Sequence, residues 1–124
     1  MNRIFVYGTL MRGYGNNRLI QNGTFVKEGR TLPNFTMISL GGFPGLLDKG
    51  DDAVVGEVWD VDDSTLKMCD RLEGHPTWYR RTPIELEDGE KVEVYIYLKA
   101  GSKEVDNRVS TGSWREHTNR RSQR

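Results

Sequence analysis

The stretch Ile4-Phe5-Val6-Tyr7-Gly8-Thr9-Leu10 begins almost at the first residue and joins an apolar strand to a glycine turn. Its first four residues are β-branched or aromatic, which favours a strand that is covered on both faces of a sheet. Gly8 interrupts the pattern, and its missing Cβ permits positive φ or close approach of another molecule. The stretch therefore predicts either an ordinary strand end or a loop whose backbone N–H groups face a small anion.

The composition is that of one small domain without a strong charge. The 124 residues include 18 basic and 18 acidic side chains, so no overall field attracts nucleic acid, and none is expected as a partner. Cys69 is the only cysteine, which excludes an intramolecular disulfide. No segment resembles a signal peptide or a membrane-spanning helix. We expect a soluble, cytoplasmic protein of a reducing compartment, without a membrane partner.

Most of the chain reads as short strands. Apolar and alternating runs predict strands over residues 24–32, 35–40, 53–61, 80–86 and 91–98, and a helical turn over residues 18–21. The Asp88-Gly89 dipeptide predicts a tight hairpin between the last two strands. Residues 41–45 are rich in glycine and proline, so we expect an irregular loop that presents Phe43. The chain is therefore predicted to be mainly β.

One helix is predicted, from Ser64 to Glu73. Asp62 and Asp63 precede it as N-cap and first-turn acids, and Gly74 is a natural stop. One face is expected to be apolar and buried, and it consists of Leu66, Cys69 and Leu72. The Cys69 thiol is therefore interpreted as buried and inert rather than nucleophilic.

Glu73 is the second candidate functional residue, because the predicted helix places its carboxylate at the negative end of the helix dipole. The dipole and any burial both favour the protonated form, which suits a general base that works near neutral pH. The alternative is a solvated glutamate, or one that pairs with Arg71, Arg80 or Arg81. The sequence alone leaves both open.

The remaining polar residues give weaker evidence for a functional site than Gly8 and Glu73 do. His75 and His117 lie far apart in the chain and are interpreted as surface residues, so a zinc site with Cys69 is disfavoured and no metal is expected. Residues 103–124 are polar and basic, with Trp114 as their only large apolar side chain. We expect this tail to be flexible except where Trp114 docks. A role of its arginines, from Arg108 to Arg124, in RNA binding remains an alternative.

Four motifs then occur in an order that is known from one family. They are Phe5-Val6-Tyr7-Gly8-Thr9-Leu10, Phe43-Pro44-Gly45, Leu72-Glu73-Gly74 with Trp78-Tyr79-Arg80-Arg81, and Gly112-Ser113-Trp114-Arg115. From about residue 2 to 115 the chain resembles the gamma-glutamylcyclotransferase-like superfamily, in particular its gamma-glutamylamine cyclotransferase branch and the related plant avirulence-induced proteins. The resemblance implies an α+β fold, a small mixed β-barrel with flanking short helices. That domain is expected over residues 1–102, followed by the tail over 103–124.

The same resemblance implies an enzyme that releases 5-oxoproline from a small γ-glutamyl amine or peptide, with no cofactor. The backbone amides of Gly8, Thr9 and Leu10 would hold the γ-glutamyl group, with Tyr7 beside them. Glu73 would be the catalytic acid/base, while Tyr79 would contact the substrate or serve only in packing. The alternative function is a non-catalytic module of the same fold that binds a small carboxylate or a protein. A monomer or weak homodimer is expected.

Overall fold

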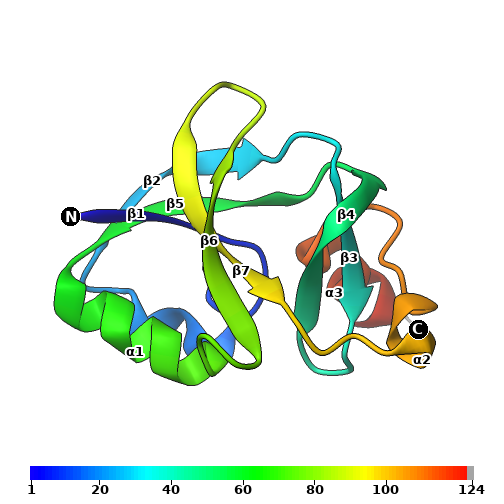
Figure 1. The fold of residues 1–124 in the computed structure, drawn as a ribbon. Coiled ribbons are helices and arrows are strands. Elements are labelled where there is room, and N and C mark those ends of the chain that lie inside the picture. The colour runs from blue at the N-terminus through cyan, green and yellow to red at the C-terminus, as the bar shows by residue number, and fades with distance from the viewer. Residues whose placement is uncertain (123–124) are drawn as a thin grey trace.

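A computed structural model describes residues 1–122, and for Lys103 and residues 120–122 it describes the backbone alone. Gln123 and Arg124, which belong to the predicted basic tail, lie outside the described residues. The elements, shown in Figure 1, are β1 (Asn2–Val6), η1 (Gly15–Leu19), β2 (Thr24–Arg30), β3 (Phe35–Ser39), β4 (Pro44–Asp52), β5 (Val55–Val61), α1 (Asp63–Glu73), β6 (Tyr79–Glu85), β7 (Lys91–Tyr97), α2 (Ser102–Val105) and α3 (Trp114–Ser122).

Five strands form a mixed sheet in the order β2-β5-β1-β7-β6, and β1 lies at its centre. It pairs antiparallel with β5, where Ile4 is opposite Trp59, and parallel with β7, where Ile4 is opposite Glu93. Ile4 and Phe5 are both fully buried, as predicted for a strand covered on both faces. The α+β class is confirmed. The two outer strands, β2 and β6, meet where they end: Thr31 and Leu86 form an isolated antiparallel bridge, and the Glu87 N–H donates to the Arg30 carbonyl at 2.9 Å.

A separate two-stranded sheet, β3–β4, lies at the other end of the molecule from α1 (Figure 1). The prediction of an irregular loop over residues 41–45 is wrong for its last two residues, because Pro44 and Gly45 begin β4. Pro44 pairs with Ser39 at an edge that needs no N–H from proline. A Cβ on Gly45 would lie 3.0 Å from Cβ of Tyr97, so β4 passes close to the end of β7.

Helix α1 has the predicted start and stop. The Asp62 carboxylate accepts a hydrogen bond of 2.7 Å from the Thr65 N–H, and Gly74 ends the helix in the left-handed conformation at φ 66°. Its apolar face is narrower than predicted, because Leu66 and Cys69 are buried whereas 43% of Leu72 is exposed. Leu72 belongs to the last turn, which lines a cavity described below.

The C-terminal segment differs from the expected flexible tail. Residues 102–105 and 114–122 form α2 and α3. Val109 and Trp114 are 3% and 2% exposed, and the Val109 N–H donates to the Met37 carbonyl at 2.8 Å. Backbone pairing to β3 and burial of a large aromatic ring hold the segment on the domain despite its polar composition. Val109 and Trp114 therefore belong to the same hydrophobic core as the domain over residues 1–102, although the predicted boundary assigns them to the tail.

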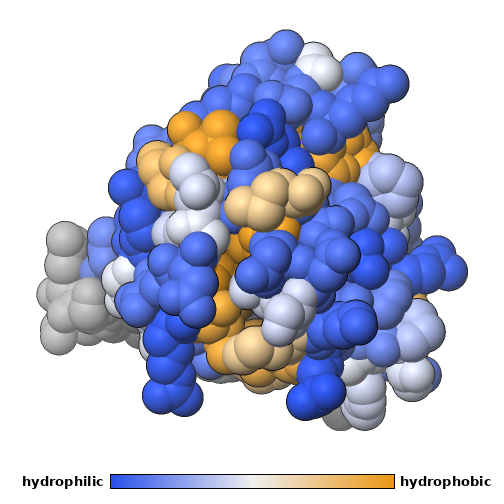
Figure 2. Space-filling model, turned by 90° about the vertical axis from the view of Figure 1, so that its left-hand side faces the viewer, coloured by the Kyte–Doolittle hydropathy of each residue, from blue (hydrophilic) through white to orange (hydrophobic). Residues whose placement is uncertain are grey.

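The surface is mostly polar. Figure 2 views the molecule from the left-hand side of Figure 1 and shows hydrophilic residues around a narrow apolar band that runs through a hollow. Among residues 1–122 there is no helix with the length and apolar character needed to cross a bilayer. Arg108 of the predicted basic tail is held by Asp52, whose two carboxylate oxygens accept from Nε and Nη2 at 2.8 and 2.7 Å.

Candidate active site

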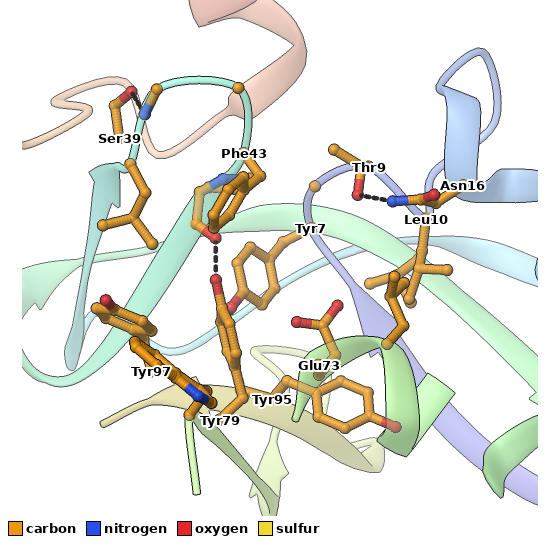
Figure 3. A pocket seen from close by; sticks show the side chains of 18 of the residues that line it. Tyr7, Thr9, Leu10, Asn16, Ser39, Phe43, Glu73, Tyr79, Tyr95 and Tyr97 are labelled. Atoms are coloured by element: carbon orange, nitrogen blue, oxygen red, sulfur yellow. Dashed lines mark hydrogen bonds between the residues drawn. The ribbon is translucent and has the colours of Figure 1, made fainter. Parts of the chain in front are cut away.

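A cavity of about 1200 Å³ lies where β1 ends, bounded by the last turn of α1, the start of β4 and the ends of β6 and β7. All six residues that the sequence analysis selected line it, namely Tyr7, Gly8, Thr9, Leu10, Glu73 and Tyr79. They come from two regions more than sixty residues apart, and the fold places them on facing walls (Figure 3). The predicted set is therefore brought together in one site.

The turn Gly8–Leu10 has its carbonyl groups engaged and its N–H groups open. The Gly8 carbonyl accepts from the Met11 N–H at 3.1 Å, and the Thr9 carbonyl accepts from the Asn16 N–H at 3.2 Å. The Leu10 carbonyl accepts from Asn17 Nδ2 at 2.8 Å. None of the three N–H groups donates a hydrogen bond within residues 1–122. We call Gly8–Leu10 the amide cradle, because its three donors are available to an oxygen ligand in the cavity.

Gly8 is required for a reason that the sequence did not indicate. Its φ is not positive. A Cβ at this position would lie 2.6 Å from Cγ and 2.7 Å from Cδ of Pro44, a distance at which one of the two segments must move. Glycine thus lets the turn after β1 pack directly against the first residue of β4.

Glu73 projects into the cavity from the last residue of α1 (Figure 3). Burial raises the pKa of its carboxyl group to about 7. The predicted direction is confirmed, with burial as its cause. Over residues 1–122 no donor is recorded for this carboxylate, and Arg81 instead pairs with Asp70 at 2.9 Å and Glu93 at 2.8 Å. The alternative of a glutamate paired with that arginine is therefore wrong.

Two buried tyrosines flank Glu73 with their hydroxyl protons already committed. The Tyr7 hydroxyl donates to the Tyr95 carbonyl at 2.7 Å, and the Tyr79 hydroxyl donates to the Pro44 carbonyl at 2.9 Å. Burial first, and the nearby Glu73 carboxylate in addition, raise the pKa of both phenols above their usual value. Both rings therefore form walls of the cavity whose hydroxyl groups stay protonated at neutral pH.

The sequence analysis missed several lining residues. They include Asn16, Phe43, Tyr95, Tyr97, Glu104 and His117. Alternation along a strand puts Tyr95 and Tyr97 on the same face of β7, but nothing near them in the sequence indicates that this face borders a cavity. Tyr97 packs on Tyr79 with ring centroids 5.0 Å apart. His117 was expected on the surface, whereas its ring stacks on Trp114 at 5.1 Å and lines the cavity.

The last turn of α1 is tied to the sheet below the cavity. Asp70 Oδ1 accepts from the Tyr95 hydroxyl at 2.7 Å and from Arg81 Nε at 2.9 Å. His75 Nδ1 accepts from the Arg81 N–H at 3.0 Å. The Cys69 thiol is fully buried, and burial raises its pKa to about 12, so it stays protonated and inert as predicted. These contacts hold the helix end, and with it Glu73, against β6 and β7.

The arrangement can perform acid–base chemistry on a bound oxyanion or carboxylate. One carboxyl group with a pKa of about 7 can both accept and return a proton near neutral pH. Three backbone donors on the facing wall can hold the substrate's oxygen atoms, and the aromatic walls reduce the water around both.

Comparisons with known proteins agree with this geometry. The family model described as gamma-glutamyl cyclotransferase, AIG2-like matches residues 4–116. A gamma-glutamylcyclotransferase-like protein of Vibrio cholerae is 35% identical over 111 residues, which cover 90% of this chain and 93% of the relative. The gamma-glutamylaminecyclotransferase of Rattus norvegicus is 33% identical over 119 residues, covering 81% and 79% of the two chains.

Two solved structures share the fold. An AIG2-like protein from Mus musculus superposes with a TM-score of 0.74 at 30% identity, covering 85% of this chain and 82% of that chain. An uncharacterised protein from Pyrococcus horikoshii superposes with a TM-score of 0.81 over 99% of this chain and 98% of its own, at 22% identity. From the family match over nearly the whole domain and these relatives, the chain belongs to the gamma-glutamyl cyclotransferase, AIG2-like family.

Proposed function

We propose that this protein is a γ-glutamylcyclotransferase that releases 5-oxoproline and a free amine from a γ-glutamyl amine or peptide, with Glu73 as acid/base. The observation that carries the proposal is an unpaired carboxylate with a raised pKa, which faces an open set of backbone donors. Family membership supports the same reaction class.

In the proposed reaction the substrate is its own nucleophile. Glu73 takes a proton from the α-ammonium group, and the freed amine attacks the γ-carbonyl carbon of the same molecule. Attack leaves two protons on the ring nitrogen. Glu73 delivers its proton to the leaving nitrogen as the bond from the γ-carbon breaks. It then takes the second proton from the ring nitrogen and passes it to the released amine, which departs as an ammonium ion. Atoms and charges balance without any further reactant. Ring closure within one molecule supplies much of the proximity that catalysis needs, so holding the substrate folded is the main task of the cavity.

The amide cradle is assigned to the oxygen atoms of the γ-glutamyl group. The hydroxyl groups of Tyr7 and Tyr79 already donate to main-chain carbonyls, so the N–H groups of Gly8, Thr9 and Leu10 are the better candidates to stabilise negative charge. Preorganised backbone donors of this kind typically contribute several kcal/mol to catalysis in acyl transfer.

The raised pKa makes Glu73 a suitable base for an ammonium group. An α-ammonium has a pKa of about 8, so transfer to an ordinary glutamate with a pKa of about 4.3 would cost about 5 kcal/mol. With a pKa of about 7 for Glu73, the same transfer costs about 1.4 kcal/mol. The burial that raises the pKa therefore removes most of this barrier.

We further propose that the leaving group is an amine, as in the gamma-glutamylamine cyclotransferase branch. The rat relative bears that activity in its name. The cavity extends beyond the cradle and Glu73 to Phe43, Trp78 and Tyr97, which leaves room for a leaving group with an apolar arm. A non-catalytic carboxylate-binding module is the competing function. It is less well supported, because a second carboxylate in the cavity would repel such a ligand.

The test is release of 5-oxoproline from γ-glutamyl-ε-lysine and a panel of γ-glutamyl dipeptides. We expect wild-type protein to release it from at least one substrate and Glu73→Gln to be slower by about 10²- to 10⁴-fold. Glu85→Gln is the control, since Glu85 is an exposed carboxylate on β6 outside the cavity. No release by the wild type would refute the enzyme, and equal rates for wild type and Glu73→Gln would refute the assigned base.

A further inference from the structure

Glu57 is a buried carboxylate that the proposed reaction does not use. It lies on β5, is 3% exposed and is not among the residues that line the cavity. A charged group is rarely buried to this extent unless several donors compensate for the lost water. Its partners therefore indicate what it does.

All the recorded partners of Glu57 belong to a cluster behind the amide cradle. Oε1 accepts from the backbone N–H of Arg12 at 3.0 Å and from Trp59 Nε1 at 3.1 Å. Oε2 accepts from Arg12 Nε at 3.0 Å and from Arg115 Nη2 at 3.5 Å. One carboxylate thus holds Arg12 by its main chain and its side chain together.

Arg12 is two residues beyond the cradle, so fixing it fixes the end of the turn. The Met11 N–H closes that turn on the Gly8 carbonyl at 3.1 Å. At the other end of the turn Gly8 packs against Pro44. The Arg12 carbonyl accepts from Arg115 Nη2 at 2.7 Å, which brings α3 into the same cluster. The guanidinium of Arg12 also lies 3.8 Å over the ring of Phe25, which limits its movement.

We propose that Glu57 is a positioning residue for substrate binding, which acts through Arg12 to hold the amide cradle in the geometry that receives the γ-glutamyl group, with Arg115 of α3 as the second support. This inference rests on the proposed function. The Glu57 side chain does not line the cavity, so its effect on the substrate passes through the backbone of residues 8–12, which its hydrogen bonds to Arg12 hold in place. A displacement of the cradle by about 1 Å can reduce the rate by about 100-fold.

The expected kinetic signature is specific. Glu57→Gln removes the charge that pairs with Arg12, so the cradle loosens while Glu73 and its surroundings stay unchanged. We expect kcat/KM to fall by about 10- to 100-fold, with KM raised and kcat lowered together because the same N–H groups bind the substrate and stabilise negative charge. The acid limb of the pH–rate profile should be unchanged. Arg115→Met changes a half-exposed side chain and should raise KM in the same direction by a smaller factor. It serves as the second variant if Glu57→Gln does not fold.

The control is Asp60→Asn. Asp60 is on the same strand, and its two oxygens accept from Arg3 Nε and Nη2 at 2.8 Å each, but this pair is not part of the cluster behind the cradle. Asp60→Asn also loses an ion pair on β5, so it tests whether the loss of any ion pair on this strand is enough to raise KM. We expect wild-type KM for Asp60→Asn. A rise in KM of the same size in this variant would overturn the inference.

A second measurement does not depend on catalysis. Amide hydrogen exchange at Met11 and Asn16, whose N–H groups donate to the Gly8 and Thr9 carbonyls, should be faster in ligand-free Glu57→Gln and Arg115→Met than in wild type and Asp60→Asn. If no γ-glutamyl substrate reacts but hydrogen exchange changes as expected, the proposed function fails, while the conclusion that Glu57 holds the turn through Arg12 stands. If the wild type is active and neither KM nor exchange changes in the two variants, the positioning role of Glu57 is refuted.

Discussion

Replacing Glu73 by glutamine should make the protein more stable at alkaline pH while it removes activity. In the folded protein burial raises the pKa of this carboxyl group from 4.5 to about 7. The folded state therefore binds the Glu73 proton more tightly than the unfolded chain does. The stability of the wild type must fall as pH rises from about 4.5 to about 7, and this contribution is level above that range.

The size of the effect follows from the two pKa values. Between pH 5 and pH 8 the cost of ionising Glu73 in the folded state grows by about 2.5 kcal/mol, at about 1.36 kcal/mol per pKa unit. Glutamine has nearly the same shape and does not ionise, so Glu73→Gln escapes this cost. The difference in unfolding free energy between variant and wild type should move by that amount in favour of the variant.

The assay is urea unfolding followed by tryptophan fluorescence at pH 5, 6, 7 and 8, for wild type, Glu73→Gln and Glu85→Gln. Any cost of burying the glutamine amide is the same at each pH and cancels in the comparison. Glu85→Gln, at an exposed position outside the cavity, is the control for the substitution itself. A flat difference for Glu73→Gln would refute the reasoning, because the carboxylate would then not be destabilised by burial.

The same titration governs catalysis. The value of kcat/KM should rise with pH around a midpoint of about 7, and at pH 6 it should be about tenfold below its plateau. This is measured as initial rates of 5-oxoproline release at low substrate concentration. An acid limb centred between about pH 4 and 5, the range of an ordinary glutamate, would contradict the assignment.

Three further substitutions test the supports of the cavity. Gly8→Ala places a Cβ 2.6 Å from Cγ of Pro44, and we expect a loss of about 1–3 kcal/mol in urea unfolding and a raised KM. Asp70→Asn removes the charge that faces Arg81 at 2.9 Å and should cost about 1–3 kcal/mol, with unfolding at high salt as the check on its ionic part. Trp114→Ala should cost about 3–5 kcal/mol, read from thermal unfolding; a loss below about 1 kcal/mol would mean that α3 contributes little to the core.

Features that depend on a few neighbouring residues were predictable from the sequence. The buried strand at Ile4–Tyr7, the Asp88-Gly89 hairpin and the helix stop at Gly74 all follow from local patterns and turn chemistry. The position of Glu73 at the helix end followed in the same way. Its partner loop could be named, but only the resemblance to a family indicated that the two meet.

Features that depend on contacts between distant segments were not predictable. Nothing near Gly8 in the sequence indicates that Pro44 lies against it, and nothing in the polar segment around Trp114 shows that its ring is 2% exposed. The bridge between Thr31 and Leu86 is a further case, because nothing near either residue in the sequence indicates that the two outer strands of the sheet meet. Burial is a property of the assembled fold, so local composition underestimates it.

The raised pKa of Glu73 is also a non-local property. It depends on which acceptors the hydroxyl groups of Tyr7 and Tyr79 donate their hydrogen bonds to. Had the hydroxyl of Tyr7 or Tyr79 donated to Glu73, the hydrogen bond would have stabilised the carboxylate and lowered its pKa. Each hydroxyl instead donates to a main-chain carbonyl, of Tyr95 and Pro44 respectively. Because main-chain carbonyls of β4 and β7 accept these two hydrogen bonds, neither hydroxyl group donates to the Glu73 carboxylate. Burial therefore raises the pKa of Glu73 without a hydrogen bond from either tyrosine to offset it.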